Sequence, residues 1–246
     1  MNLQNKEISM ETILKNKENL LTGRIEYFTE LVKVAVSLSN EIANDPSDDV
    51  KQIKSMLVTE IITMLTASWR NTLPFNLFVS EKTAVFAKSL GVDDLCKYDY
   101  SLKFGMDEVA SLVDDPDFLA VASHLSEQDV AKLNKALAKD DKAVNSNVML
   151  QWEHAYTGRM FTADVTELIS NLSQNNASGD EISESVKELV EKQAIVWILK
   201  TENYEIIEKG FKDVRLPNWE SAYKECGIEL SPKSKEYYLV AFGKEW

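Results

Sequence analysis

The feature that most constrains the fold is a helical pattern of apolar residues that fills the first seventy positions with one interruption. Apolar side chains recur three or four positions apart from Ile8 to Ala43, as in amphipathic helices. Polar and breaker residues at 44–47 end this pattern, and a second one follows over about 48–71. The short connection predicts an antiparallel helical hairpin. In the second helix, the apolar residues predicted to face a core are Val50, Ile53, Met56, Leu57, Ile61, Met64, Leu65 and Trp69.

Glycine and proline are scarce along the whole chain, with eight and five in 246 residues, whereas strands joined by tight turns need more of both. Residues 98–104 alternate apolar and polar side chains, which predicts an extended connector or a short hairpin arm. We therefore predict an all-α fold of about eight to ten helices. After the hairpin, helices are expected over 81–90, 106–113, 116–124, from 127 to about 139, and over about 146–173, 180–200, 203–211, 218–226 and 232–242.

Charge divides the chain unevenly. Residues 1–90 carry 10 basic and 11 acidic side chains, whereas residues 91–246 carry 17 and 29. This shift and the poorly patterned stretch near 91–105 predict an N-terminal helical hairpin region over 1–91 and a larger acidic helical body over 92–246. The alternative is that all the helices pack as a single domain.

A formal net charge of −13 weighs against direct binding of nucleic acid, because that affinity comes from lysines and arginines that neutralise phosphates. The same charge disfavours an anionic membrane surface. The longest apolar run, Ala194–Leu199, has six residues, while a bilayer span needs about 20. No membrane partner is therefore predicted.

The cellular location is predicted from the N-terminus and the cysteines. The first residues have no charged-then-apolar signal pattern, and the two isolated cysteines, Cys96 and Cys226, fit a reducing compartment. We expect a cytoplasmic protein. Export by a route without a cleaved signal stays open.

Motifs for metals and nucleotides are absent from the sequence. His124 and His154 are the only histidines, and neither lies in a zinc or di-iron motif. The sequence has no glycine-rich phosphate-binding motif and no GxSxG. We therefore expect neither a metal nor a cofactor.

The best candidates for acid–base catalysis are His154 and Glu153, since histidine titrates near neutral pH. If residues 146–173 form one helix, Trp152, Tyr156 and Arg159 share a face and His154 points elsewhere. The structural alternative is an aromatic core stripe with a histidine that makes a routine hydrogen bond.

An acidic segment is the first candidate partner-binding surface. Residues 93–117 carry eight acidic and two basic side chains, and such a field attracts a basic partner surface. The alternative is a solvated face with helix caps. The candidate residues are Asp93, Asp94, Asp107, Glu108, Asp114, Asp115 and Asp117.

Aromatic side chains are the second candidate, because aromatic anchors dominate many protein interfaces. Phe75 and Phe78 lie in a predicted connector, and Trp246 ends the chain. The alternative is that they fill the protein's own core.

These observations predict a non-catalytic protein-interaction module, namely an adaptor, an inhibitor or an assembly factor that acts through a helical surface and an acidic patch. The expected partner is a protein, with a homo-oligomer left open. Two alternatives stay open: an acidic nucleic-acid mimic that blocks a basic cleft, and a helical hydrolase or lyase that uses His154 and nearby carboxylates.

Overall fold

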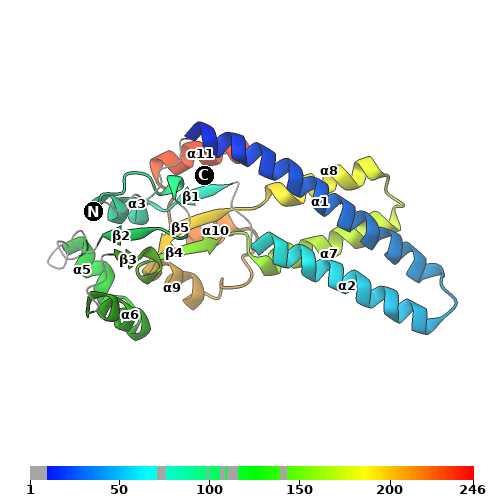
Figure 1. The fold of residues 1–246 in the computed structure, drawn as a ribbon, viewed down its shortest axis with the longest axis horizontal. Helices are drawn as coiled ribbons and strands as arrows, with labels where there is room; N and C mark the ends of the chain where they lie inside the picture. The colour runs from blue at the N-terminus through cyan, green and yellow to red at the C-terminus, as the bar shows by residue number, and fades with distance from the viewer. Residues whose placement is uncertain (1–9, 71–75, 99, 106–108, 110–115, 139–142) are drawn as a thin grey trace. The chain divides into compact units, whose positions relative to one another are not determined.

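The computed structural model describes residues 10–70, 76–98, 100–105, 109, 116–138 and 143–246 (Figure 1). The described part of the chain is mostly helical, as predicted, with ten α-helices. It also contains two small sheets that the all-α prediction left out. The helices are α1 (Met10–Asn44), α2 (Asp48–Arg70), α3 (Glu81–Ser89), α5 (Pro116–Ser123), α6 (Glu127–Ala138), α7 (Gly158–Gln174), α8 (Gly179–Glu191), α9 (Lys200–Glu208), α10 (Trp219–Glu225) and α11 (Pro232–Phe242).

The chain forms two compact units, each built from separate segments. Unit 1 comprises residues 1–13, 76–155 and 194–246, and unit 2 comprises residues 14–75 and 156–193. The predicted domain boundary between residues 91 and 92 lies within unit 1.

Unit 2 is helical, and its helix α7 packs against both α1 and α2. Phe161 of α7 stacks on Trp69 of α2, with ring centroids 4.4 Å apart, and contacts Phe28 of α1 at 5.9 Å. Near the connection between α1 and α2, Lys54 forms ion pairs with Asp45 at 2.8 Å and with Glu41 at 3.0 Å. Aromatic packing and ion pairs therefore tie α1 to α2 at separate places.

Unit 1 contains a three-stranded mixed sheet. Its strands are β1 (Leu77–Val79), β4 (Leu150–His154) and β5 (Ile195–Leu199), in the order β1-β5-β4. The central strand β5 pairs parallel with β1 and antiparallel with β4. A second, two-stranded sheet pairs β2 (Lys103–Gly105) with β3 (Ala143–Asn145) in antiparallel fashion. Residues 103 and 104 of the alternating segment at 98–104 are therefore in a strand, but α5 and α6 lie between β2 and β3, so the pair is not a hairpin.

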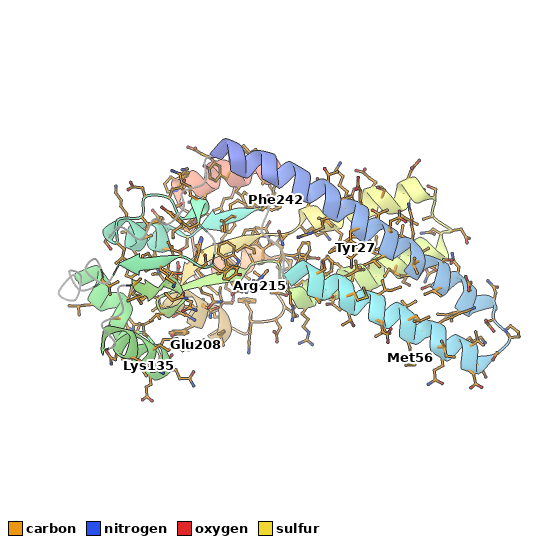
Figure 2. The ribbon with its side chains drawn as sticks, viewed as in Figure 1. Tyr27, Met56, Lys135, Glu208, Arg215 and Phe242 are labelled. Atoms are coloured by element: carbon orange, nitrogen blue, oxygen red, sulfur yellow. The ribbon has the colours of Figure 1, made fainter. Side chains whose placement is uncertain are left out.

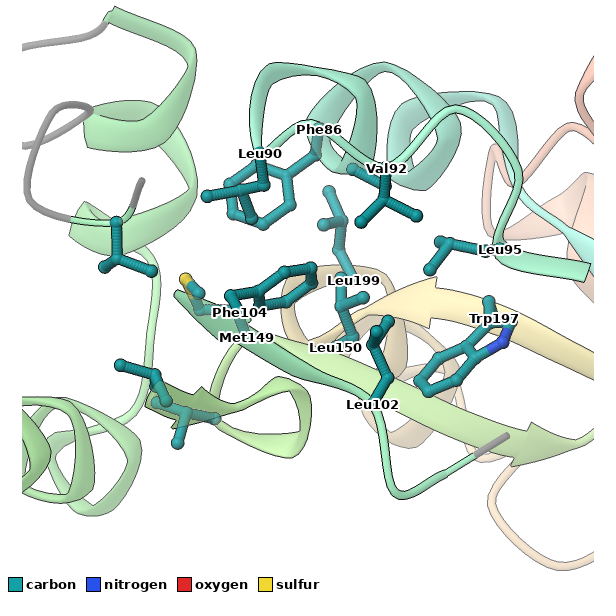
Figure 3. Packing of buried hydrophobic residues seen from close by; sticks show 14 of the residues in the cluster. Phe86, Leu90, Val92, Leu95, Leu102, Phe104, Met149, Leu150, Trp197 and Leu199 are labelled. Atoms are coloured by element: carbon teal, nitrogen blue, oxygen red, sulfur yellow. The ribbon is translucent and has the colours of Figure 1, made fainter. Parts of the chain in front are cut away.

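The three-stranded sheet is covered on both faces. Trp197, Leu199 and Leu150 point to one face, where they join a hydrophobic cluster with α3 and β2 (Figure 3). Phe78 and Glu153 point to the other face, toward the C-terminal segment. A strand buried on both faces carries an unbroken apolar run, and all five residues of β5 are buried.

Two predicted helices are therefore wrong in part. The pattern at about 146–173 was expected to be one helix, but its first residues form the 3-10 turn Ser146–Val148 and strand β4. The helix expected over 180–200 ends with α8 at Glu191, and strand β5 follows. An apolar run of five residues fits a buried strand as well as a helix, and periodicity does not separate the two.

Helix starts agree better with the sequence. Ser80, Ser126 and Ser231 accept hydrogen bonds from backbone N–H groups three residues later, as N-cap side chains do. The predicted helix over 106–113 lies mostly outside the described residues.

Candidate interaction surface

The catalytic candidates Glu153 and His154 are adjacent on β4, so their side chains point to opposite faces of the sheet. Glu153 forms an ion pair with Arg215, whose side chain is fully buried. Arg215 Nη1 also donates to the carbonyl oxygens of His154 at 2.6 Å and Ala155 at 2.5 Å, and its Nε donates to Phe211 at 3.1 Å. The Glu153 carboxylate thus anchors the segment after α9 to the end of β4.

The predicted shared face of Trp152, Tyr156 and Arg159 does not exist. Trp152 lies on strand β4, Tyr156 lies between β4 and α7, and Arg159 is in α7. Trp152 packs against Trp197 of β5, with ring centroids 4.8 Å apart. Sequence spacing failed here because the segment changes from strand to helix between these residues.

A second polar cluster, which the sequence did not predict, lies at the carboxyl ends of β1 and β5. The Ser80 hydroxyl donates to Glu202 Oε2 at 2.6 Å, and the backbone N–H of Leu199 donates to the same oxygen at 2.9 Å. Burial raises the pKa of Glu202, although these hydrogen bonds and one from Thr83 counteract it. Ser80 is completely buried, and this hydroxyl–carboxylate pair links the start of α3 to the start of α9.

The cysteines have the properties of unreactive thiols. Both Cys96 and Cys226 are free and half-buried. Burial, with a smaller contribution from Asp94, raises the pKa of Cys96 to about 12, and burial also raises the pKa of Cys226. Because the thiolate is the nucleophile, a raised pKa disfavours nucleophilic chemistry at both positions. Within the described ranges, no three His, Cys, Asp or Glu side chains come together as a metal site.

The acidic segment is only partly described. Asp93 is exposed. Asp94 caps a 3-10 turn by accepting from the Cys96 N–H at 3.1 Å, and it forms an ion pair with Lys233. Asp107, Glu108, Asp114 and Asp115 lie outside the described residues, and Asp117 lies in α5. Asp94 therefore serves as a cap and an ion-pair partner.

Phe78 and Trp246, predicted as partner anchors, belong to an aromatic cluster of unit 1. Phe78 is 1% exposed and stacks on Trp219, with ring centroids 6.2 Å apart. Trp246 is half-buried, contacts Trp219 at 5.3 Å, and donates from Nε1 to Glu229 at 3.0 Å. Burial makes Phe78 a core residue and not an anchor for a partner. Phe75, the third aromatic candidate, lies outside the described residues.

An exposed apolar surface does exist, on a helix that the sequence assigned to the core. Leu65 and Trp69 of α2 are fully buried, as predicted. Five other apolar residues of α2 are exposed, from 37% for Val50 to 58% for Ile53, and this part of the prediction is wrong. We refer to these five as the α2 apolar face; Figure 2 labels one of them, Met56. They are Val50, Ile53, Met56, Leu57 and Met64.

The α2 apolar face is continuous and poor in charge. At 3.6 residues per turn, Val50, Ile53, Leu57 and Met64 fall within an arc of about 60°. Glu60 is the only charged residue between Ser55 and Trp69. Depletion of charge and enrichment of methionine are features of interface cores. One signal in the sequence could have revealed this face. The apolar positions of α2 span a wider arc of the helix than a single buried stripe requires.

No described helix is both long enough and apolar enough to cross a bilayer. Comparison with family models, with curated proteins and with solved structures gives no match to this chain.

Proposed function

We propose that this chain is a non-catalytic protein-interaction module whose α2 apolar face receives an amphipathic helix of a partner. The observation that carries the proposal is the exposure of five large apolar side chains on one helix of unit 2. Clustered apolar side chains in contact with water mark interaction sites more often than isolated ones do.

The geometry of the face favours a helical partner. Its residues recur at intervals of three, four and seven positions, the spacing by which two helices interlock side chains. Methionine side chains, present at Met56 and Met64, adapt their shape to a partner's surface.

The polar clusters of the described residues favour a protein-interaction module over the hydrolase alternative. Glu153 and His154 point to opposite sides of a strand, and Arg215 holds Glu153 in place. The Ser80–Glu202 pair is enclosed. Acid–base catalysis requires groups within hydrogen-bond reach of a bound substrate. An additional acidic patch within residues 93–117 stays a prediction.

The test is affinity capture of a tagged copy of the full chain from cells of the source organism. The same cells also produce an untagged copy, so that self-association would be detected. Every co-purifying chain is identified by mass spectrometry at moderate salt with nuclease present. We expect a stoichiometric companion with the wild type, and its loss with Ile53→Glu and with Leu57→Glu. A glutamate on the face would have to be desolvated on binding.

Gln52→Glu is the matched control, because it adds the same charge on an exposed position of α2 outside the face. Circular dichroism checks that each variant is folded. The proposal is wrong if nothing co-purifies with the wild type, or if Leu57→Glu keeps the same companion as Gln52→Glu.

A further inference from the structure

We infer that the partner helix packs across α1 as well as α2, and that lysine or arginine side chains flank its apolar stripe on both sides. This inference rests on the proposed function, because it extends the α2 apolar face and names the chemistry of the partner. Three observations of unit 2 carry it: two exposed apolar side chains on α1, an ion pair that orients α1 against α2, and the charge that the ion pairs leave over.

Two exposed apolar side chains of α1 lie on the side of that helix that meets α2. Tyr27 is 45% exposed and Val34 is 50% exposed, and Figure 2 labels Tyr27 on α1. They precede Glu41 by fourteen and seven positions, so the three side chains lie within an arc of about 40° around the helix. Glu41 forms an ion pair with Lys54 of α2 at 3.0 Å. This pair identifies the side of α1 on which Tyr27 and Val34 lie as the side next to α2.

The exposed apolar residues of the two helices turn away from α7. Phe28 of α1 and Trp69 of α2 both contact Phe161, so these rings mark the side of each helix that faces α7. At 3.6 residues per turn, Val34 lies about 120° from Phe28 around α1, and Leu57 lies about 120° from Trp69 around α2. Both rotations have the same sense along their own helices. Because α1 and α2 run in opposite directions, the two side chains turn either toward each other or away from each other.

The Lys54–Glu41 ion pair shows that Val34 and Leu57 turn toward each other. Around α2, Lys54 lies between Leu57 and the side that faces α7, and it contacts α1. Val34 precedes Glu41 by seven positions, and Ile61 follows Lys54 by seven. Val34 and Ile61 are therefore level with each other on the two helices, which present one continuous apolar surface.

The chain already neutralises most of the charge around the α1–α2 apolar surface, by which we mean Tyr27, Val34 and the α2 apolar face. Residues 21–64 carry four basic and seven acidic side chains. Of the basic ones, Arg24 is half-buried, and the three lysines form ion pairs with carboxylates of the same segment. These pairs are Lys33–Glu30, Lys51–Asp48, Lys54–Asp45 and Lys54–Glu41. The charge left for a partner is therefore negative.

Two of the remaining carboxylates, Glu26 and Glu60, lie on opposite rims of this surface. Both are exposed, and neither pairs with a cation among the described residues. Around α1, Glu26 lies about 80° beyond Val34, and around α2, Glu60 lies about 60° beyond Leu57, in each case away from the other helix. A helix seated on the surface would bring one flank near each carboxylate. Lysine or arginine on both flanks would be attracted, whereas acidic flanks would be repelled.

The rim carboxylates select the partner more than they hold it. Ion pairs between exposed side chains contribute little to affinity, while burial of apolar side chains is the main attraction. Salt should therefore reduce the preference for basic flanks without releasing the helix.

The first test measures the binding of two amphipathic helical peptides to the purified full chain by isothermal titration calorimetry. Both peptides are about three heptads long with the same leucine stripe, and their flanking positions are lysine in one and glutamate in the other. We expect the lysine-flanked peptide to bind at least about fivefold more tightly at about 0.05 M salt, and this preference to shrink at about 0.5 M while binding persists. Equal binding at low salt, tighter binding of the glutamate-flanked peptide, or no binding of either overturns the inference.

The second test separates the two rims from the general negative charge of the chain. Glu26→Lys combined with Glu60→Lys should abolish the preference for the lysine-flanked peptide. Glu167→Lys combined with Glu188→Lys changes the net charge equally, at exposed positions of α7 and α8, and should leave the preference within about twofold. Equal effects of the two double variants overturn the assignment of the rims.

The third test asks whether α1 belongs to the surface. Val34→Glu should weaken binding of the lysine-flanked peptide by at least about tenfold, as Leu57→Glu does, because the new carboxylate would have to be desolvated. Gln52→Glu adds the same charge outside the surface and should change binding by less than about twofold. Circular dichroism checks that each variant is folded.

The outcomes separate this inference from the proposed function, which is judged by the companion captured from cells. Loss of that companion with Leu57→Glu but not with Val34→Glu overturns the role of α1 and leaves the proposed function standing. A purified chain that dimerises through Leu57 in sedimentation equilibrium overturns the basic foreign helix. A companion that survives both substitutions overturns the inference and the proposed function together.

Discussion

Arg215 makes more polar contacts with the rest of unit 1 than an arginine on a protein surface usually does. Its guanidinium is buried and meets the Glu153 carboxylate and three backbone carbonyl oxygens, and Figure 2 labels it within unit 1. Removal of one partner of a buried pair leaves the other charge without compensation, which costs more than the pair contributes.

We expect Arg215→Ala to lower the free energy of unfolding by about 3–5 kcal/mol, measured by urea denaturation. Lys212→Ala, at an exposed position of the same segment, should change it by less than about 0.5 kcal/mol. Arg215→Ala combined with Glu153→Gln should recover part of the loss, because no unpaired carboxylate remains. Equal effects of the two alanine substitutions would contradict this role.

Asp129 makes the stability of unit 1 sensitive to acid. Burial alone would raise its pKa, but hydrogen bonds from Lys132 at 2.9 Å, Tyr204 at 2.7 Å and Ser126 at 2.9 Å lower it to about 2. In the unfolded chain, an aspartate has a pKa of about 3.9. The folded state therefore releases this proton more readily than the unfolded state does.

The stabilisation from Asp129 is present above about pH 4 and is lost as the pH falls toward about 2, with an upper bound of about 2.6 kcal/mol. Urea denaturation of wild type and Asp129→Asn across this range should show a difference that shrinks with acidity. Glu127→Gln, an exposed neighbour on α6, should not reproduce it. If the difference in unfolding free energy between wild type and Asp129→Asn does not change with pH, the aspartate stabilises the fold through its shape and not through its charge.

At the scale of single elements, α2 has two apolar faces with different roles. Leu57 and Leu65 are eight positions apart on one helix, yet Leu57 is 42% exposed and Leu65 is fully buried. Leu65→Ala should cost about 2–5 kcal/mol of unfolding free energy because it leaves a cavity. Leu57→Ala should cost less than about 1 kcal/mol. Thermal and urea unfolding of monomeric samples measure both, and similar costs would show that Leu57 belongs to the core.

The same helix shows how far sequence reasoning reaches. Periodicity placed α2 within one residue of its observed end, because amphipathic spacing and the acidic first turn are local signals. Which apolar positions are covered depends on the number of helices that pack against it. In unit 2, α7 contacts Trp69 through Phe161, and Thr162 bonds to Thr66 at 2.9 Å. No local signal specifies those contacts.

The strands were missed for a related reason. The Ile195–Leu199 segment is apolar throughout, so it lacks the alternation by which an exposed strand is recognised. Its pairing partners, β1 and β4, lie far from it in the sequence. The Arg215 and Glu202 clusters could not be predicted either, because they are assembled across that sheet by residues more than 60 positions apart.

At the scale of the whole molecule, the net charge opposes association with any acidic partner, including a second copy of the chain. Unit 1 carries 17 basic and 25 acidic residues, and unit 2 carries 10 and 15. Both units are therefore acidic, and two copies repel at long range whichever face they present. Dissolved ions screen this repulsion, with a Debye length of about 10 Å at 0.1 M salt and about 3 Å at 1 M.

Capture of a partner through the α2 apolar face should therefore persist as salt rises, because burial of apolar side chains needs no opposite charges. We expect the companion captured by the wild type to stay bound between about 0.05 and 0.5 M sodium chloride, and Ile53→Glu to lose it at every concentration. An acidic patch on a basic partner would behave oppositely, since its attraction is screened. A companion that dissociates as salt rises would thus indicate an interface built from ion pairs and not from α2's apolar side chains.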